Sequence, residues 1–165
     1  MRSNMPARSD AMSRAEHRTA ARLAACQALY QMDVTGRGIN ECLAEFESHW
    51  IGKEVEGAQY KPAEIAFFRD ILIGVLADQV ALDRLIDLRL EKTWPLARIE
   101  ALMRAILRAG TYELKKRLDV PARVVITEYV DVAGAFYGRD EAGMINAVLD
   151  TLAHELRLDE FANRE

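Results

Sequence analysis

Apolar residues recur at intervals of three and four along almost the whole chain, and this spacing constrains the fold more than any other feature. A side chain returns to the same face of an α-helix about every 3.6 residues, so the spacing predicts a series of amphipathic helices. The sequence contains no Asn-Gly or Asp-Gly turn between alternating segments, the pattern typical of β-hairpins. It therefore predicts an all-α fold.

Glycine and proline signals divide this pattern into six or seven helices. Thr35–Gly38 ends the first helix, Pro62 is suited to the first position of another, and a bend is expected near Ala77-Asp78. Trp94-Pro95 interrupts the chain before a wide apolar band that suits a central helix, and Asp140 is expected to cap the last helix. The apolar stripes after the first helix begin at Ile39, Ile65, Val80, Ile99, Val124 and Met144.

The predicted start of the first helix sets the domain boundaries. Ser13 and Glu16 have the spacing of a capping box, in which each side chain accepts a hydrogen bond from the backbone amide of the other. Residues 1–12 are then expected to form a flexible arm, residues 13–157 a single domain, and residues 158–165 a tail. A chain of 165 residues that is 50% hydrophobic is within the size of one domain.

The residue inventory argues against an enzyme, a metal site and a cofactor. Cys26 and Cys42 do not form a Cys-x-x-Cys pair, and His17, His49 and His154 are far apart in the sequence. The glycine-rich phosphate-binding and nucleophile motifs are absent. No apolar run approaches the ~20 residues that span a bilayer, and the polar start lacks the core of a signal peptide. We therefore expect a cytoplasmic protein without a membrane contact.

Arginine recurs every four residues near the amino terminus, at Arg14, Arg18 and Arg22. On a helix these residues share one face, and an apolar stripe from Leu23 to Val34 is expected to occupy the opposite face. The spacing alone also fits a solvated helix face with no ligand. Arginine at all three positions favours an anionic ligand, because its planar guanidinium binds phosphate better than lysine does.

The distribution of charge along the sequence also favours an anionic ligand. The chain has a net charge of −4, but its first 24 residues contain five arginines against Asp10 and Glu16. A basic segment in an acidic chain predicts an anionic partner bound at one place. Gln27 and Tyr30 follow on the same helix, and Tyr30 is expected either in the core or with its edge or hydroxyl toward a base.

Three polar residues lie among apolar ones in later helices. Glu113, Glu128 and Asn146 are expected to be buried and to bond backbone groups of neighbouring turns.

Five motifs in order resemble the NusB family of bacterial transcription antitermination factors, from about Ser13 to Leu156. They are Arg18-x-x-x-Arg22 with Gln27-Ala28-Leu29-Tyr30-Gln31, Phe67-Phe68-Arg69-Asp70 with Gly74, Ile106-Leu107-Arg108-Ala109-x-x-Tyr112-Glu113-Leu114, Asp119-Val120-Pro121, and Asn146-x-Val148-Leu149-Asp150. The resemblance implies a compact all-α bundle of about seven helices in two small helical subdomains, without catalytic activity.

The resemblance also implies partners. Family members pair with the ribosomal protein NusE, the pair binds the boxA element of ribosomal RNA leader transcripts, and the complex modifies RNA polymerase so that it ignores terminators. It implies RNA binding by Arg14, Arg18, Arg22 and Asp140, and a partner-binding face at Met103. Gln27 and Tyr30, which follow on the basic helix, are predicted as further RNA contacts, and Glu100 and Arg104 as further partner contacts. Met103 stands where the family often has an acidic residue.

One alternative function stays open at this level. A broad apolar helix face that binds a partner can also pair with itself, so the chain could be a self-associating helical module, such as a homodimer, without an RNA-binding role.

Overall fold

The computed structural model describes residues 6–53, 62–90 and 95–162, and within these ranges every regular element is helical. The all-α prediction is confirmed. None of the described helices is long and apolar enough to span a membrane. The elements are α1 (Pro6–Thr35), α2 (Ile39–Lys53), α3 (Pro62–Ala77), α4 (Gln79–Asp87), the 3-10 helix η2 (Leu96–Arg98), α5 (Ala101–Lys116), α6 (Ala122–Phe136), α7 (Arg139–Leu156) and α8 (Leu158–Phe161).

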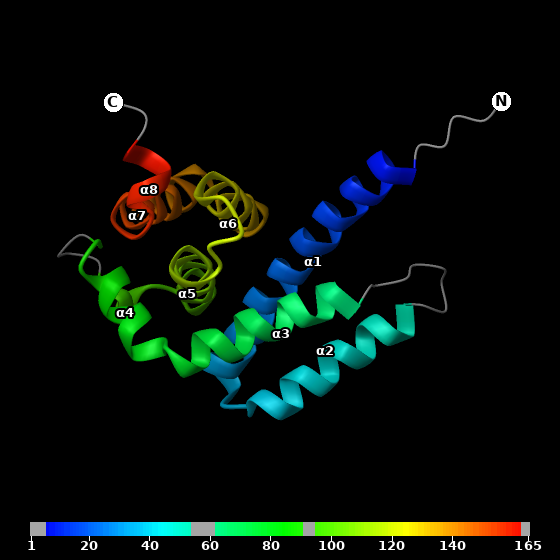
Figure 1. The fold of residues 1–165 in the computed structure, drawn as a ribbon. Helices are drawn as coiled ribbons and strands as arrows, with labels where there is room; N and C mark the ends of the chain where they lie inside the picture. The colour runs from blue at the N-terminus through cyan, green and yellow to red at the C-terminus, as the bar shows by residue number, and fades with distance from the viewer. Residues whose placement is uncertain (1–5, 54–61, 91–94, 163–165) are drawn as a thin grey trace.

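The helices form two groups that meet along α1 and α5 (Figure 1). In the first group α1 packs against α2 and α3, and in the second α5 packs against α6 and α7. α1 also contacts α5 and α6, and α4 connects the two groups by contacting α3, α5 and α7. The long α1 therefore lies at the boundary between the groups.

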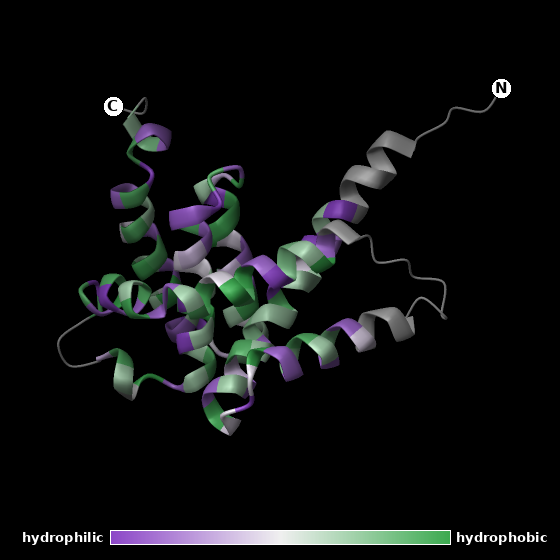
Figure 2. Cartoon of the chain, turned by 60° about the horizontal axis from the view of Figure 1, so that its bottom comes forward, coloured by the Kyte–Doolittle hydropathy of each residue, from purple (hydrophilic) through white to green (hydrophobic). Residues whose placement is uncertain are grey.

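α5 is the central helix of the core, as its wide apolar band predicts. Its residues from Met103 to Leu114 are buried except for Arg104 and Arg108, which are partly exposed. Hydrophobic residues of the neighbouring helices gather where these helices meet (Figure 2). The largest fully buried side chains around α5 are Phe68, Ile71, Leu72, Leu82, Ile86, Tyr129, Ile145, Leu149 and Leu152.

Three predicted boundaries are wrong. α1 begins at Pro6, so residues 6–12 are helical and the Ser13–Glu16 pair lies inside the helix; residues 1–5 of the predicted arm lie outside the described range. Gly138, not Asp140, precedes the first residue of α7, and Asp140 lies in the first turn. The predicted tail contains α8, whose Phe161 ring stacks on His154 with ring centroids 4.0 Å apart.

Gly74 of α3 allows a close approach to Tyr112 of α5. A Cβ atom at Gly74 would lie 2.2 Å from atoms of the Tyr112 ring, and a hydrogen bond of 2.8 Å from the Tyr112 hydroxyl to Asp70 holds that ring in place. Burial, followed by the hydrogen bond and charge of Asp70, raises the pKa of Tyr112 to about 12. The α3–α5 contact therefore requires glycine at this position.

We expect Gly74→Ala to lower the free energy of unfolding by about 1–3 kcal/mol, because the added methyl group displaces a fixed ring. Gly134→Ala on α6 is the matched control, since a Cβ atom there meets nothing within 4 Å. That control should stabilise the protein by up to about 1 kcal/mol through helix propensity. Urea unfolding of both variants checks the prediction, and equal midpoints would contradict it.

Candidate nucleic-acid interface

The buried face of α1 is not the face that its apolar stripe predicts. Ala21, Ala25 and Leu29 are buried, whereas Tyr30 is 40% exposed and Val34 is 58% exposed. The small alanine side chains let the backbone of α1 lie close to the neighbouring helices α3 and α5. The prediction that the stripe from Leu23 to Val34 is the core face is therefore wrong beyond Cys26.

Arg22 lies on this buried face and is 2% exposed. Its Nε and Nη2 donate to the two carboxylate oxygens of Glu113 at 2.8 and 3.0 Å, and its Nη1 donates to Glu128 at 2.9 Å. Burial lowers the pKa of the guanidinium, but the hydrogen bonds and charge of Glu113 raise it by more, so the net pKa lies above its ordinary value. Arg22 thus holds helices together, and its prediction as a surface RNA contact is wrong.

The partners of Arg22 also differ from the sequence prediction. Glu113 and Glu128 bind the Arg22 side chain instead of backbone groups. The Tyr129 hydroxyl donates to Glu113, and the Thr19 hydroxyl donates to Glu128 at 2.8 Å. Burial, followed by the charge of Glu113, raises the pKa of Tyr129 well above its ordinary value. This polar network joins α1 to α5 and α6 inside the protein.

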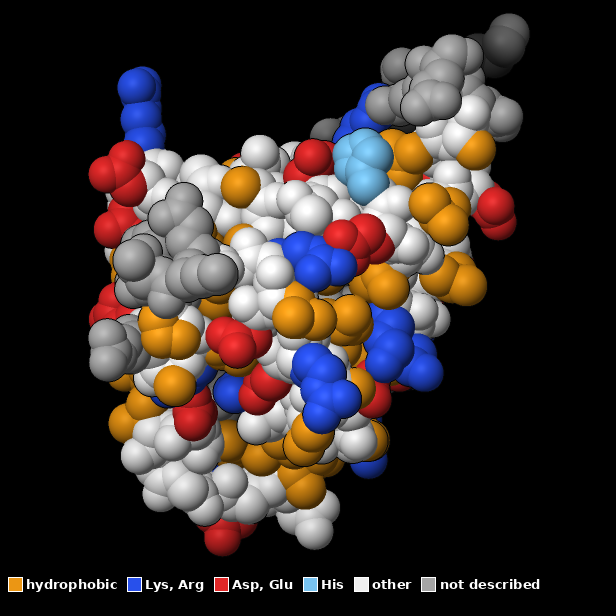
Figure 3. Space-filling view, turned by 90° about the vertical axis from the view of Figure 1, so that its left-hand side faces the viewer, with side chains coloured by type: hydrophobic (Ala, Val, Ile, Leu, Met, Phe, Trp, Pro, Cys, Tyr) orange, Lys and Arg blue, Asp and Glu red, His pale blue; other side chains and the backbone are white. Residues whose placement is uncertain are grey.

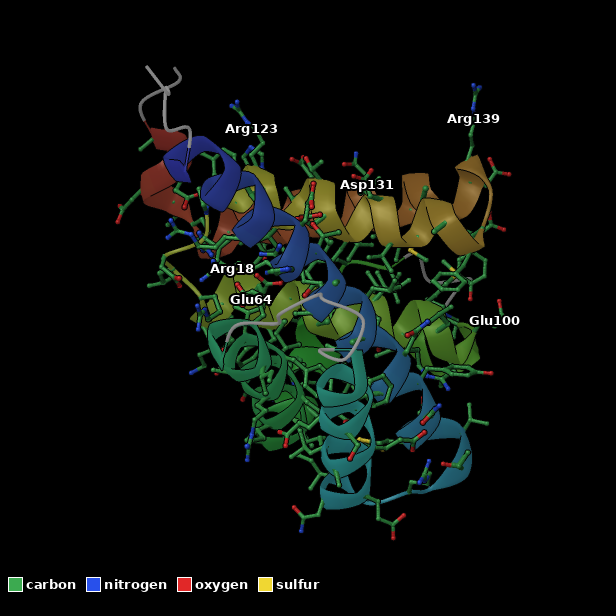
Figure 4. All side chains as sticks on the ribbon, turned by 90° about the vertical axis from the view of Figure 1, so that its right-hand side faces the viewer. Arg18, Glu64, Glu100, Arg123, Asp131 and Arg139 are labelled. Atoms are coloured by element: carbon green, nitrogen blue, oxygen red, sulfur yellow. The ribbon has the colours of Figure 1, made fainter. Side chains whose placement is uncertain are left out.

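Arg14 and Arg18 remain at the surface. Arg14 is exposed and Arg18 is half-buried, with its Cζ 4.6 Å from the centroid of the Phe67 ring. Figure 4 shows Arg18 on the side of α1 that faces α3. No carboxylate of the described residues forms an ion pair with either arginine. Two of the three predicted arginines are therefore available to an anionic ligand.

A groove beside α1 brings together two predicted RNA contacts with aromatic residues from two other helices, α2 and α6. It has a volume of about 450 Å³. It is lined by Gln27, Tyr30, Gln31, Phe46, Leu102 and Phe136. Gln27 is exposed, and Phe136, the last residue of α6, is 46% exposed. Phe136 continues the buried stripe of α6, so the sequence gives no signal that it faces solvent.

Glu100 lies close to the same groove. Burial, followed by the charge and hydrogen bond of Glu100, raises the pKa of Tyr137 to about 12, and Tyr30 contributes to the same shift. Asp140 is exposed three residues beyond Tyr137, in the first turn of α7. The end of α6, the start of α7 and the start of α5 therefore meet beside Tyr30.

The predicted partner-binding residues are separated by their burial. Met103 is 3% exposed and belongs to the core, so its prediction as a surface contact is wrong. Its apolar thioether fits a buried position where a carboxylate would need a partner. Arg104 is partly exposed and donates to Asp33 at 2.9 Å and to the Ile99 carbonyl. Glu100 is exposed.

Arg104 lines a second depression, of about 560 Å³, between the end of α1, α4, η2 and α5. Opposite charges alternate in it, because Asp33 and Asp83 pair with Arg104 and Arg108. Figure 3 shows basic and acidic side chains interspersed on the side of the molecule where α4 lies. This surface is suited to a polar protein partner more than to an RNA backbone, which needs an excess of positive charge.

Asn146 is exposed on α7, which contradicts its prediction as a buried amide.

Among the described residues no group of three or more histidine, cysteine or acidic side chains is arranged to hold a metal ion.

Comparison with known proteins gives one consistent family. The NusB family model matches residues 19–154. The transcription antitermination protein NusB of Bradyrhizobium sp. (strain ORS 278) is 63% identical over 155 residues, which cover 94% of this chain and 92% of the relative. The protein of the same name from Rhodopseudomonas palustris (strain HaA2) is 66% identical over 148 residues, which cover 90% of this chain and 88% of the relative.

Solved structures agree with the sequence relatives. NusB of T. maritima superposes with a TM-score of 0.74 at 28% identity, covering 88% of this chain and 96% of that one. A crystal structure of the antitermination factors NusB and NusE in complex with dsRNA has a chain that matches the fold, with a TM-score of 0.68 at 22% identity, covering 85% of this chain and 98% of that one. Its family model, its relatives and its helical architecture together show that this chain belongs to the NusB family.

Proposed function

We propose that this chain is a transcription antitermination factor that binds the boxA element of ribosomal RNA leader transcripts together with the ribosomal protein NusE. The observation that carries the proposal is the groove beside α1. In it the exposed rings of Tyr30 from α1 and Phe136 from α6 lie beside Gln27, and α1 also presents Arg14 and Arg18. The name of the relatives and the complex of one structural neighbour with NusE and RNA support it.

The groove supplies the chemistry of single-strand recognition. Unpaired bases stack on aromatic side chains and are identified by hydrogen bonds to their edges. Tyr30 and Phe136 offer two exposed rings, and the Gln27 amide can both donate to and accept from a base edge. The Asp140 carboxylate accepts hydrogen bonds, so its proposed role is to bind amino or imino groups of a base. Arg14 and Arg18 bind phosphates and fix the register.

The partner completes this surface. NusE is proposed to dock where Glu100 and Arg104 are accessible, next to both the groove and the charged depression. A partner docked at Glu100 would lie near Tyr30, so in this proposal one RNA strand contacts both proteins. The assembled complex then acts on RNA polymerase. In this mechanism the chain acts by binding, and it needs no cofactor.

The salt dependence of RNA binding tests the two exposed arginines. Each phosphate contact on a single strand contributes about 0.7 to the slope of log K against log salt concentration. We expect the double variant Arg14→Ala, Arg18→Ala to flatten this slope by about 1.4 in a fluorescence anisotropy titration of boxA RNA. Arg123→Ala, which removes an exposed arginine on α6, should leave the slope unchanged. An unchanged slope in the double variant would remove both arginines from the RNA site.

A further inference from the structure

Three arginine side chains contact the ring of one buried phenylalanine, Phe67 of α3. The Cζ atoms of Arg18, Arg22 and Arg117 lie 4.6, 4.9 and 4.9 Å from the centroid of that ring. Each distance is within the ~6 Å over which a cation is attracted to an aromatic face. These four residues, which we call the Phe67 cluster, gather positive charge from α1 and from the end of α5.

The three arginines of the cluster differ in how many carboxylates pair with them. Arg22 is paired with two glutamates, and Arg117 pairs with Asp70 at 3.4 Å and with Asp119 at 3.0 Å. Arg18 forms no ion pair with any residue of the described ranges, although it is half-buried and contacts the same ring as two other arginines. Arg18 is therefore the one arginine of the cluster that an added anion could pair with without displacing a carboxylate of the described residues.

Two members of the cluster also have hydrogen-bond donors to spare. Arg18 donates to no acceptor among the described side chains and carbonyls, and Nε of Arg117 is buried without an acceptor there. Glu64, which Figure 4 labels near Arg18, directs its buried carboxylate to Nδ1 of His17 at 3.9 Å. The free donors of Arg18 and Arg117 thus adjoin one ring, and contact with the ring restricts the orientation of both guanidinium planes.

The cluster is separate from the aromatic groove. Tyr30 is twelve positions after Arg18 on α1, which corresponds to about 18 Å along the helix axis and a rotation of about 120°. The two sites share α1 but use different neighbours, since Tyr30 lies beside α6 and Arg18 beside α3 and the end of α5.

We infer that Arg18 and Arg117 together bind one backbone phosphate of the RNA, and that Phe67 is the positioning residue that orients both guanidinium groups. A phosphate offers only acceptors and a negative charge, which matches two guanidinium forks with unused donors. The inference rests on the RNA-binding function proposed above and extends the RNA surface from α1 to the end of α5. Continuity with Arg14 and the groove along α1 favours RNA over a free anion as the source of the phosphate.

A double-variant cycle tests the shared phosphate. Arg18→Ala and Arg117→Ala should each flatten the salt slope of boxA binding by about 0.7, and the double variant should lose no more than either single variant. A loss of about 1.4 in the double variant would mean two independent contacts and would overturn the inference, as would unchanged slopes. Arg123→Ala is the control for charge: Arg123 is exposed on α6, and the slope should stay at the wild-type value.

Phe67→Leu tests the positioning role without changing charge. It should weaken RNA binding in the wild-type background and have no further effect in the Arg18→Ala background. A purely structural role would lower the melting temperature but leave the salt slope unchanged. If Phe67→Leu does not fold, Arg18→Lys replaces it: the charge remains, but the planar fork is lost, so RNA binding should still weaken.

Two further sets of binding measurements distinguish a failure of this inference from a failure of the proposed function. If Tyr30→Ala weakens boxA binding while the Arg18 and Arg117 variants keep the wild-type slope, only this inference fails; if wild-type protein with NusE does not prefer boxA, the proposed function fails. Inorganic phosphate at constant ionic strength should compete with RNA for the wild type and not for Arg18→Ala. Phosphate binding that leaves RNA affinity unchanged would identify a free-anion site and overturn the assignment to RNA.

Discussion

Arg157→Ala is expected to lower the free energy of unfolding by about 3–5 kcal/mol, because it removes the group that satisfies the carbonyl oxygens at the end of α5. Arg157 is buried and donates from Nε to the carbonyl of Leu114 at 2.6 Å and from Nη1 to that of Val120 at 2.9 Å. From Nη2 it donates to the carbonyls of Glu113 and Arg117 at 3.0 and 2.8 Å. Without it, the carbonyls of Leu114 and Val120 lose this donor, whereas those of Glu113 and Arg117 keep a backbone amide as donor.

The loss is large relative to the total stability of a domain of this size, which is about 5–15 kcal/mol. Urea unfolding followed by circular dichroism measures it. Arg139→Ala, at the exposed first residue of α7, is the control and should change the stability by less than about 0.5 kcal/mol. Arg157→Lys should be almost as unstable as the alanine variant, because one ammonium group cannot reach four carbonyls. Equal stability of the Arg157 and Arg139 variants would contradict the assigned role.

Arg22→Ala is expected to have an effect of similar size, about 3–5 kcal/mol, because Glu113 would lose its cationic partner at a fully buried position and keep only the hydrogen bond from Tyr129. The same network connects α1 to both α5 and α6, so the variant should also loosen the boundary between the two groups of helices. Thermal and urea unfolding measure the change. Arg14→Ala, on the same helix and exposed, should be close to the wild type.

The double variant Arg22→Met, Glu113→Leu separates the cost of the unpaired carboxylate from the loss of packing. It should be more stable than Arg22→Ala, since apolar side chains of similar volume can replace a buried ion pair. If Arg22→Ala were as stable as Arg14→Ala, the buried ion pairs of Arg22 would not hold the helices together.

The sequence predicts the helices themselves well, because most of them carry a strong apolar period. The band from Ile99 to Leu114 identifies α5 as central, and the bend between α3 and α4 lies at Asp78, where it is expected. The start of α1 is missed because Ser13 and Glu16 satisfy a local capping rule that continued helix formation from Pro6 overrides.

The candidate site is predicted less well, and α1 shows why. Its arginine spacing fits a solvated face, but the alanines at positions 21, 25 and 28 allow the same side of the helix to pack closely, and Arg22 is buried with two glutamates from distant helices. No local pattern relates Arg22 to residues about 90 positions away. The same limit applies to Phe136, whose exposure depends on where α6 extends past its neighbours.

Under the proposed function, the two roles of the arginines reconcile an acidic chain with an RNA ligand. Arg22 and Arg157 are buried and stabilise the boundary around α5, whereas Arg14 and Arg18 keep their charge accessible at the start of α1. A net charge of −4 gives weak attraction to RNA in general, so the proposal assigns most of the affinity and specificity to base stacking in the groove and to the partner.

Binding of boxA RNA by the protein, by NusE and by their equimolar mixture tests this account most directly. Fluorescence anisotropy with boxA RNA and with a scrambled RNA of the same composition gives the six dissociation constants. We predict that the mixture binds boxA at least about tenfold more tightly than either protein alone, a difference of about 1.4 kcal/mol, and that it discriminates against the scrambled RNA. A mixture that binds no better than its tighter component, or that binds both RNAs equally, would contradict the account.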